Sequence, residues 1–563
     1  MKFSEMPYKR PDGEVMLQSV EELAKRIEPA KSADEVIEII KEYDRIHCEF
    51  STQLNIAYIR NTIDTRDAFY DAEKTFFDDF LPLCEEKNQL FMKALFDCPY
   101  RKELEKTISP VVFKNIELQL KGFDPKIIPL MQKENKLCSE YVKLNATAAV
   151  EIDGKTLPLT KLGPYKQSDN RETRRLAYQK EGEFFDAHRQ EYDRIFDELV
   201  KVRDEQAKAL GFPNFVPLGY IRQMRNCYDW SAVGNFREQV KDVIVPICDK
   251  IKEAQKKRIG VLDFKLYDDP YLFSDGNPKP HGTPEELLAA AKKMYNSMSE
   301  QTGEFINAMF DMDMFDLLAK DGKAPGGYCT SLDGYKMPFI FSNFNGTAAD
   351  VDVLTHEAGH AFAFYVAARE IPYGMMRDPS LDACETHSMS MEFLTSDYHK
   401  LFFGEDTRKY ELSHAEDAIT FIPYGCMVDN FQEIIYTHPE YTPEQRNGVW
   451  ADLERRYRPY LDFDNLPMYS RGAGWQRQHH IYEMPFYYIE YCMAGTLALQ
   501  FFSLWLKDKK EAWEKYLAFV KQGGTKTFIE LAHDSGLYSP TDNGAIEKIM
   551  SNISAWLYEK EAQ

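Results

Sequence analysis

The sequence lacks the features that mark several classes of protein. Its ten cysteines lie far apart and form no C-x-x-C pair, which argues against a thiolate zinc ribbon and against a disulfide scaffold. Positive charge is also scarce, because 69 Lys and Arg residues face 91 Asp and Glu residues, for a net charge of −22. Nucleic-acid binding depends on clustered cations. We therefore expect no nucleic-acid partner, and a reducing compartment, most simply the cytoplasm.

Signals for secretion and for membrane insertion are scarce as well. The first fifteen residues have no apolar core of a signal peptide. The longest apolar stretch near a motif, residues 361–368, is far shorter than the ~20 residues that cross a bilayer. No low-complexity tract or fixed-period repeat marks a linker. We expect no membrane partner and one compact body, with a soft division between an N-terminal helical portion (1–200) and a portion that carries the motifs (201–563).

Helix signals, in contrast, are present along almost the whole chain. A composition of 44% hydrophobic and 28% charged residues is typical of a folded protein. Capping-box patterns predict helix starts at Ser32, Thr283 and Thr442. Residues 169–210 keep helical periodicity with interleaved charges, typical of a solvated helix face. The sequence therefore predicts a mostly α fold.

Strand signals are few. Asp153-Gly154 stands between β-prone residues within 147–159, which predicts a hairpin. Residues 326–344 contain a Gly pair, an Asp-Gly turn and then an extended apolar run, 338–344. We therefore expect only a few short β-strands within the helical fold.

The segment His356-Glu357-Ala-Gly-His360 carries the chemistry. We expect it on a helix that runs through Ala368, with Thr347 as a cap at the helix start. Histidines four residues apart leave the same face of a helix and can converge on one ion, and zinc accepts imidazole nitrogens in a tetrahedral shell. Glu357 can reach a metal-bound water without occupying a ligand position. The alternative is a pair of histidines that fit this pattern by accident.

A catalytic zinc site needs a third protein ligand and one open position. Glu370 is the nearest carboxylate, but it ends the same helix, and ten residues at ~1.5 Å each place it ~15 Å beyond His360. Glu385 stands 29 residues after His356, on a second predicted helix that can return to the histidines. We therefore predict Glu385 as the third ligand, with a solvated helix carboxylate as the alternative.

Other side chains near these three ligands receive supporting roles or none. Glu392 follows Glu385 by two helical turns on the same face and suits a partner that orients an imidazole. Asp352, one turn before His356, could do the same. His387 and His399 are left out as ligands, because His387 is two positions from Glu385 and points away.

These motifs resemble a known family. The HEAGH segment, followed by Glu385-Thr-His-Ser388-Met-Ser-Met-Glu392, is similar to the thimet oligopeptidase and oligoendopeptidase F family of zinc metallopeptidases, closest to the bacterial branch with oligoendopeptidase F and the Pz-peptidases. Residues 338–344 and 480–491 also match, whereas residues 1–130 match only in helical character. The resemblance implies a large helical ellipsoid, with a deep central substrate channel that has zinc at its floor.

The resemblance also implies roles near the C-terminus. It implies that Tyr488 and Tyr491, three residues apart on a predicted helix, hydrogen-bond the tetrahedral oxyanion or the substrate carbonyl. His480 is the family-like histidine, although the adjacent His479 leaves that assignment open. Core packing is the alternative for the tyrosines. Residues 339–344 are either an edge strand that pairs with the substrate main chain or an internal strand with both edges covered.

The sequence thus favours a zinc-dependent oligoendopeptidase that hydrolyses internal bonds of short unstructured peptides, with one Zn²⁺ per chain. Glu357 would act as general base on the zinc-activated water and pass the proton to the leaving amine. A preference for collagen-derived peptides rests only on similarity to the Pz-peptidases. The alternatives are a zinc exopeptidase of the dipeptidyl carboxypeptidase or aminopeptidase type, and a non-catalytic helical binding protein with a structural metal. The sequence gives no indication of the oligomeric state.

Overall fold

The computed structural model describes residues 1–320, 322–324 and 326–562 of the 563-residue chain. These residues form two compact units, each built from three separate stretches. Unit 1 comprises Met1–Leu120, Pro278–Arg408 and Leu497–Tyr538, and unit 2 comprises Lys121–Asn277, Lys409–Thr496 and Ser539–Gln563. The division suggested near residue 200 lies inside a helix, α9 (Arg189–Ala209). The predicted division stays a prediction, because it separates the chain at one position, whereas each compact unit combines three separate stretches of the chain.

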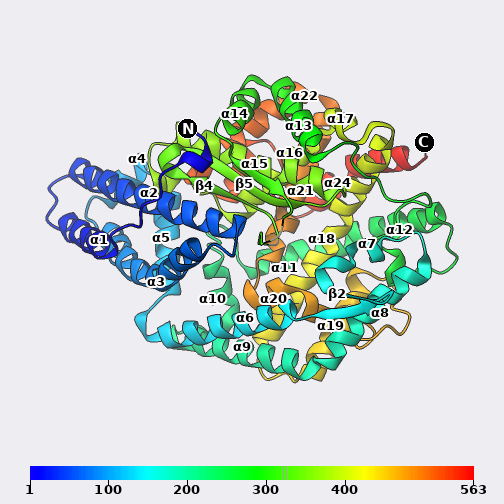
Figure 1. The fold of residues 1–563 in the computed structure, drawn as a ribbon. Helices are drawn as coiled ribbons and strands as arrows, with labels where there is room; N and C mark the ends of the chain where they lie inside the picture. Colours follow the sequence, from blue (N-terminus) through cyan, green and yellow to red (C-terminus); the bar gives the residue numbers. More distant parts are fainter. Residues whose placement is uncertain (321, 325, 563) are drawn as a thin grey trace. The chain divides into compact units, whose positions relative to one another are not determined.

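Unit 1 contains the N-terminal helices, a three-stranded sheet and the helices of the HEAGH region (Figure 1). Its helices are α1 (Gly13–Ile27), α2 (Ala33–Ile63), α3 (Ala68–Phe96), α4 (Arg101–Thr107), α5 (Pro110–Gly122), α13 (Pro284–Met298), α14 (Glu300–Asp311), α15 (Ala349–Glu370), α16 (Leu381–Leu394), α17 (Lys400–Phe403), α22 (Lys509–Val520) and α23 (Phe528–Asp534). Its strands are β3 (Phe315–Leu318), β4 (Tyr328–Leu332) and β5 (Met337–Phe344). The predicted mostly α fold is confirmed here.

Unit 2 is helical apart from one hairpin. Its helices are α6 (Ile128–Ala146), α7 (Gly163–Lys166), α8 (Arg171–Ala187), α9, α10 (Phe215–Arg222), α11 (Trp230–Gln239), α12 (Val245–Ile259), α18 (Thr407–Thr437), α19 (Pro443–Tyr457), α20 (His479–Glu483), α21 (Tyr488–Lys507) and α24 (Ala545–Ala562). The strands are β1 (Ala149–Ile152) and β2 (Lys155–Pro158). Helices α5, α18 and α21 continue across a unit boundary.

The capping signals in the sequence predict helix starts correctly. Ser32 accepts a hydrogen bond from the backbone of Glu35 at the start of α2, and complete capping boxes at Thr283 and Thr442 begin α13 and α19. The region 169–210 differs from a single helix, because it divides into α8 and α9 at His188. Side-chain caps thus fix where these helices begin, since they satisfy N–H groups that have no partner within the helix.

The N-terminal helices pack against one another and against the end of α15. Residues 13–96 form α1, α2 and α3, which lie side by side and are drawn in blue in Figure 1. Their apolar faces share one buried cluster with α5 and with the C-terminal turn of α15, which includes Val20, Ile27, Ile40, Phe91, Phe113 and Ala367. This cluster fixes the C-terminal end of the helix that carries the HEAGH segment.

The sheet of unit 1 decides between the two positions that the sequence left open for the run 339–344. Its strand order is β3–β5–β4, with β5 parallel to β3 and antiparallel to β4. The run 339–344 belongs to β5 and is therefore an internal strand rather than an edge strand. The four-residue strand β3 is not among the strands that the sequence predicts. Among the described residues, β4 is the edge strand on the side of α2 (Figure 1).

The predicted hairpin is confirmed, with Asp153 and Gly154 in left-handed conformation at its turn. The predicted cap of α15 is wrong. The N-cap is Ala348, which makes no side-chain capping bond, and the Thr347 hydroxyl donates instead to Asn345. Asp350 in the first turn of α15 accepts backbone hydrogen bonds from Asn345 and Gly346, so a carboxylate holds the loop that enters the helix.

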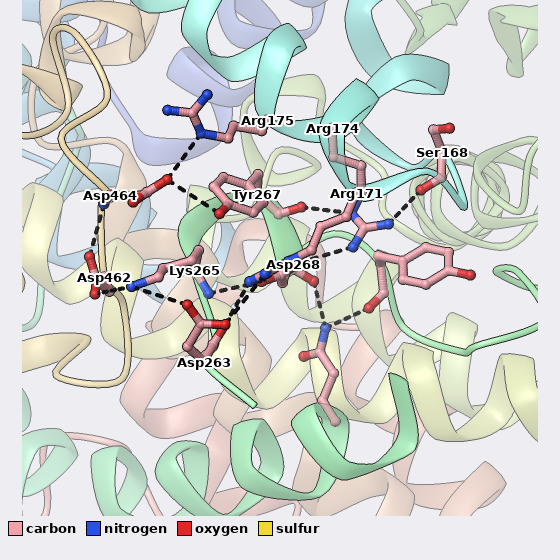
Figure 2. A network of polar contacts seen from close by, with 12 residues as sticks. Ser168, Arg171, Arg174, Arg175, Asp263, Lys265, Tyr267, Asp268, Asp462 and Asp464 are labelled. Carbon is pink, nitrogen blue, oxygen red and sulfur yellow. Dashed lines mark hydrogen bonds and ion pairs between the residues drawn. The ribbon is translucent and has the colours of Figure 1, made fainter. Parts of the chain in front are cut away.

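A buried ion-pair network stabilises unit 2 (Figure 2). Asp268 is fully buried and accepts hydrogen bonds from Arg171 at 2.6 Å and Arg174 at 2.9 Å, both in the first turn of α8. Arg174 also donates to the Tyr267 carbonyl at 3.0 Å, and the Lys265 backbone donates to Asp268. Burial raises the pKa of Asp268, but the two arginines outweigh this effect and hold it below its usual value. The ionised Asp268 therefore ties the 263–268 segment to α8.

Helix α21 is the one helix of the described residues that is long and apolar enough to cross a bilayer. By length and composition alone Tyr488–Lys507 meets this test, and 83% of its apolar window is buried within the structure. The helix is longer than the apolar stretch 361–368 beside the HEAGH segment. A core helix of a folded protein passes the same test, so this single helix is weak evidence for a membrane span.

Candidate active site

Helices α15 and α16 bring three predicted ligands together. The donor atoms of His356, His360 and Glu385 all lie within 4.8 Å of one another. Glu385 Oε2 lies 3.5 Å from His356 Nε2 and 3.6 Å from His360 Nε2. Within the part of the chain that the structure describes, this is the one His/Cys/Asp/Glu cluster of metal-binding geometry.

The geometry of these donors fits a tetrahedral metal. Bonds of ~2.0–2.1 Å to a tetrahedral zinc place neighbouring ligand atoms about 3.3 Å apart; the two separations from Glu385, 3.5 and 3.6 Å, are close to this value, and all three donors lie within 4.8 Å. Two imidazoles and one carboxylate are also donors that zinc accepts. The three side chains therefore suit one divalent cation with a position left over.

Glu392 and Ser388 hold the ligands in place. Glu392 Oε1 lies 2.6 Å from His356 Nδ1, so the other ring nitrogen, Nε2, faces Glu385. This contact matches the orienting role predicted for Glu392, whereas that role stays a prediction for Asp352. The Ser388 hydroxyl lies 3.0 Å from the backbone carbonyl oxygen of Glu385 and 3.3 Å from its carboxylate oxygen Oε2. Both supports come from α16, one turn apart.

Burial and charge act in opposite directions on the two histidines. Burial lowers the pKa of His360 to about 4, so its imidazole is neutral at pH 7. Burial acts in the same direction on His356, but Glu385 and Glu392 outweigh it and raise the pKa of His356 well above its usual value. The surroundings of the two imidazoles are therefore rich in negative charge, which attracts a cation.

Glu357 stands next to the ligands on α15 and is half-buried. Burial raises the pKa of Glu357, and the charges of Glu385 and Glu392 add to this effect, while His356 and a hydrogen bond from the Cys329 backbone on β4 act in the opposite direction. Glu357 is not one of the three clustered donors. The Glu357 carboxylate thus lies next to the three clustered donors and to the edge strand β4.

The predicted C-terminal residues form an aromatic cluster in unit 2. The rings of Tyr488 and Tyr491 have centroids 5.7 Å apart, and the His480 ring lies 4.9 Å from Tyr488 and 6.3 Å from Tyr491. Phe421 of α18 packs against both tyrosines. Burial raises the pKa of Tyr488, so its hydroxyl stays a hydrogen-bond donor at neutral pH.

The structure distinguishes the two adjacent histidines. The His479 side chain is 60% exposed and lies 3.5 Å from Glu483, and its ring lies 4.1 Å from the His480 ring. His480 lies within the cluster, and its Nδ1 is 3.0 Å from Gln478 Nε2, while Gln478 Oε1 accepts a hydrogen bond of 2.8 Å from Tyr424. His480 is therefore the histidine whose position matches the prediction.

Comparison with known proteins identifies the family. The model of "Peptidase M3 N-terminal domain" matches residues 3–123, and that of "Peptidase family M3" matches residues 164–551. The chain belongs to peptidase family M3. The second match contains His356, His360 and Glu385 as well as every residue of the tyrosine cluster. The first match extends the family resemblance to the N-terminal residues, where the sequence motifs gave none.

Curated relatives and one solved structure are similar to this M3 chain. Oligopeptidase PepF of Bacillus subtilis (strain 168) is 23% identical over 391 residues, which cover 66% of this chain and 55% of the relative. The chromosomal oligoendopeptidase F of Lactococcus lactis subsp. cremoris is 23% identical over 67% of this chain and 61% of the relative. The matches thus span less than two thirds of each relative. The structure of Pz peptidase A with an inhibitor is 43% identical over the full length of both chains, with a TM-score of 0.94.

The aromatic cluster of this M3 chain is held by two arginines that the sequence does not predict to lie near it. Arg225 donates to Glu490 Oε1 at 2.8 Å and to the Phe486 carbonyl, and Arg203 donates to the Tyr482 carbonyl. Phe486 has a φ of +68°, an uncommon conformation for a residue with a side chain. These buried cations hold the turn between α20 and α21, the helices on which His480, Tyr488 and Tyr491 lie. No sequence pattern links them to it, because they lie more than 260 residues away.

Two exclusions made from the sequence agree with the structure. Glu370 is the last residue of α15, and its carboxylate pairs with Lys521 at 2.9 Å rather than with the ligand group. His387 is buried with its ring edge against Phe519, at a centroid distance of 5.3 Å. Glu385 is therefore the carboxylate that the structure places beside His356 and His360, and its role as a ligand stays a prediction.

Proposed function

We propose that this M3 chain is a zinc-dependent oligoendopeptidase that hydrolyses internal bonds of short unstructured peptides. One observation carries the proposal: His356, His360 and Glu385 present three donor atoms within 4.8 Å, with the carboxylate of Glu357 adjacent in sequence and not among them. Three protein ligands with an open position are typical of catalytic zinc sites, whereas structural zinc sites are closed by four.

We assign one Zn²⁺ to the three donors. When bound, zinc would supply Lewis acidity, because it lowers the pKa of a water ligand and polarises a peptide carbonyl. Glu357 would accept the proton of the attacking water and transfer it to the leaving amine. Glu392, through its 2.6 Å contact with His356 Nδ1, would keep Nε2 as the ligand atom.

We assign the stabilisation of negative charge on the substrate carbonyl to Tyr488, Tyr491 and His480. Their rings form one cluster, and the tyrosine hydroxyls are donors at neutral pH. Hydrogen-bond donors preorganised for a developing oxyanion account for about 10²–10³ in turnover each. The clustering supports a shared role, whereas the alternative of core packing predicts little effect on turnover when a hydroxyl is removed.

We propose β4 as the strand that binds the substrate main chain. The internal position of β5 excludes the run 339–344 from this role, and β4 is the neighbouring edge strand. Its Cys329 backbone contacts Glu357, and the Asn55 side chain donates to the Ser331 carbonyl at 2.8 Å. Main-chain pairing gives affinity with little demand on side chains, which suits an enzyme that acts on varied peptides.

Two further assignments belong to this proposal. The ten cysteines are all free thiols, which supports a reducing compartment such as the cytoplasm. The similarity to Pz peptidase A over the whole chain supports short peptides as substrates, with collagen-derived peptides as the first to try.

The Glu357→Gln variant tests the proposal. It should retain zinc with the affinity of the wild type and lose peptidase activity, because glutamine cannot accept the proton. Activity near the wild-type value with zinc bound would show that Glu357 is not the general base. The Glu385→Ala variant completes the test: unchanged zinc affinity there would show that Glu385 is not a ligand.

A further inference from the structure

Gly359 lies between the two histidines of α15, at a close approach to α16. A Cβ at this position would lie 2.6 Å from the Ser388 Cα and 2.9 Å from the His387 carbonyl oxygen. Both atoms belong to the backbone, so no side-chain rotation relieves the contact. A glycine inside a helix costs about 1 kcal/mol relative to alanine, so this position requires a glycine for packing rather than for helix formation.

The contact point is connected directly to the ligand group. Ser388, whose Cα faces Gly359, donates through its hydroxyl to Glu385 Oε2 at 3.3 Å. Glu392, one turn further along α16, contacts His356 Nδ1. The backbone that Gly359 touches therefore stands between the two carboxylates that reach the histidines.

Helix α16 is also held by α22, which packs against both α15 and α16. The His387 carbonyl accepts a hydrogen bond of 2.9 Å from Tyr516, a fully buried residue of α22. The His387 ring packs against Phe519 of the same helix. Displacement of α16 relative to α15 would therefore also disturb the hydrogen bond from Tyr516 to the His387 carbonyl.

We infer that Gly359 is a positioning residue for the metal centre, because its missing side chain sets the separation of α15 and α16 at which Glu385 reaches His356 and His360. The inference rests on the proposed ligation. A methyl group at 359 would need the Ser388 Cα to move from 2.6 Å to at least 3.4 Å, the lower bound of ordinary contact, which is 0.8 Å. Metal–ligand distances tolerate only about 0.2 Å.

The test is the zinc dissociation constant of the full-length Gly359→Ala variant, measured by competition with a chromophoric chelator. We expect binding at least about 10-fold weaker than in the wild type, since changes around metal ligands typically cost 10- to 100-fold in affinity. The thermal unfolding midpoint of each metal-free protein, measured in parallel, separates an effect on the metal centre from an effect on the fold.

Two glycines provide matched controls. Gly448 lies on α19, and a Cβ there meets nothing within 4 Å, so Gly448→Ala should leave zinc affinity unchanged. Gly182 lies on α8 of unit 2, where a Cβ would lie 2.3 Å from the Pro467 carbonyl oxygen. Gly182→Ala thus introduces a comparable backbone clash elsewhere and should lower the unfolding midpoint while keeping zinc affinity.

Wild-type zinc affinity in Gly359→Ala would overturn the inference, and so would an equal loss of affinity in Gly182→Ala. If Gly359→Ala does not fold, Ser388→Ala tests the same connection without a clash, with binding about tenfold weaker expected and unchanged binding overturning it. Failure of the proposed function has a different signature: a wild-type protein that binds no zinc, or a His356→Ala variant that binds it as tightly as the wild type.

Discussion

Replacing Glu392 by glutamine measures how strongly zinc affinity depends on a residue outside the ligand group. Glu392 Oε1 lies 2.6 Å from His356 Nδ1, and the two side chains are only 16% and 26% exposed. Glutamine keeps a hydrogen-bond acceptor but removes the negative charge that favours a basic, correctly oriented imidazole. A hydrogen bond to a charged group contributes about 1.5–3 kcal/mol, and about 1.4 kcal/mol is a tenfold change in an equilibrium constant. We therefore expect Glu392→Gln to bind zinc about 10- to 100-fold more weakly.

Competition with a chromophoric chelator at fixed pH and ionic strength gives the zinc dissociation constants of the wild type and of this variant. Glu286→Gln is the control, because Glu286 is an exposed carboxylate of the same unit that accepts a hydrogen bond from the Thr283 backbone N–H at the start of α13. Equal zinc affinity in Glu392→Gln and the wild type, or an equal loss in Glu286→Gln, would show that the charge of Glu392 does not support the metal site.

Three further variants have defined outcomes. Burial raises the pKa of Glu134, but Arg203 and Arg222 outweigh this effect and lower the pKa to about 2. The ionised form of Glu134 therefore stabilises the fold by about 3 kcal/mol above pH ~4.5. This contribution is lost as the pH falls toward 2. Glu134→Gln should lower the unfolding midpoint at pH 7 and flatten its decline between pH ~5 and ~3; an unchanged decline in thermal scans would contradict this. Tyr488→Phe and Tyr491→Phe should each lower kcat by about 10²–10³ with a smaller change in KM; steady-state kinetics that give a kcat within about twofold of the wild type would favour core packing instead.

Local signals in the sequence predict much of this fold and of the ligand group. Histidines at positions 356 and 360 share a face because of the helical period alone, and a helix–turn–helix return of limited length brings Glu385 to them. Capping boxes at Thr283 and Thr442 begin helices because their hydrogen bonds are local.

What the sequence does not predict depends on contacts between distant segments. The run 339–344 reads equally well as an edge or an internal strand, and pairing of β5 with both β3 and β4 decides between the two. Arg203 and Arg225 donate to the backbone carbonyls of Tyr482 and Phe486 from more than 260 residues away, which no local pattern predicts. The need for glycine at 359 arises only when α16 is packed against it.

The proposed function depends on the cleavage of internal peptide bonds through a metal held by His356, His360 and Glu385. The decisive measurement is digestion of a graded set of peptides blocked at both ends, with and without a chelator, with the product ends read by mass spectrometry. We expect internal cleavage of the short blocked peptides, loss of cleavage with chelator, and recovery when zinc is restored. Blocked peptides that stay intact while free ones are trimmed from an end, or cleavage that persists in the chelator, would contradict the proposed activity.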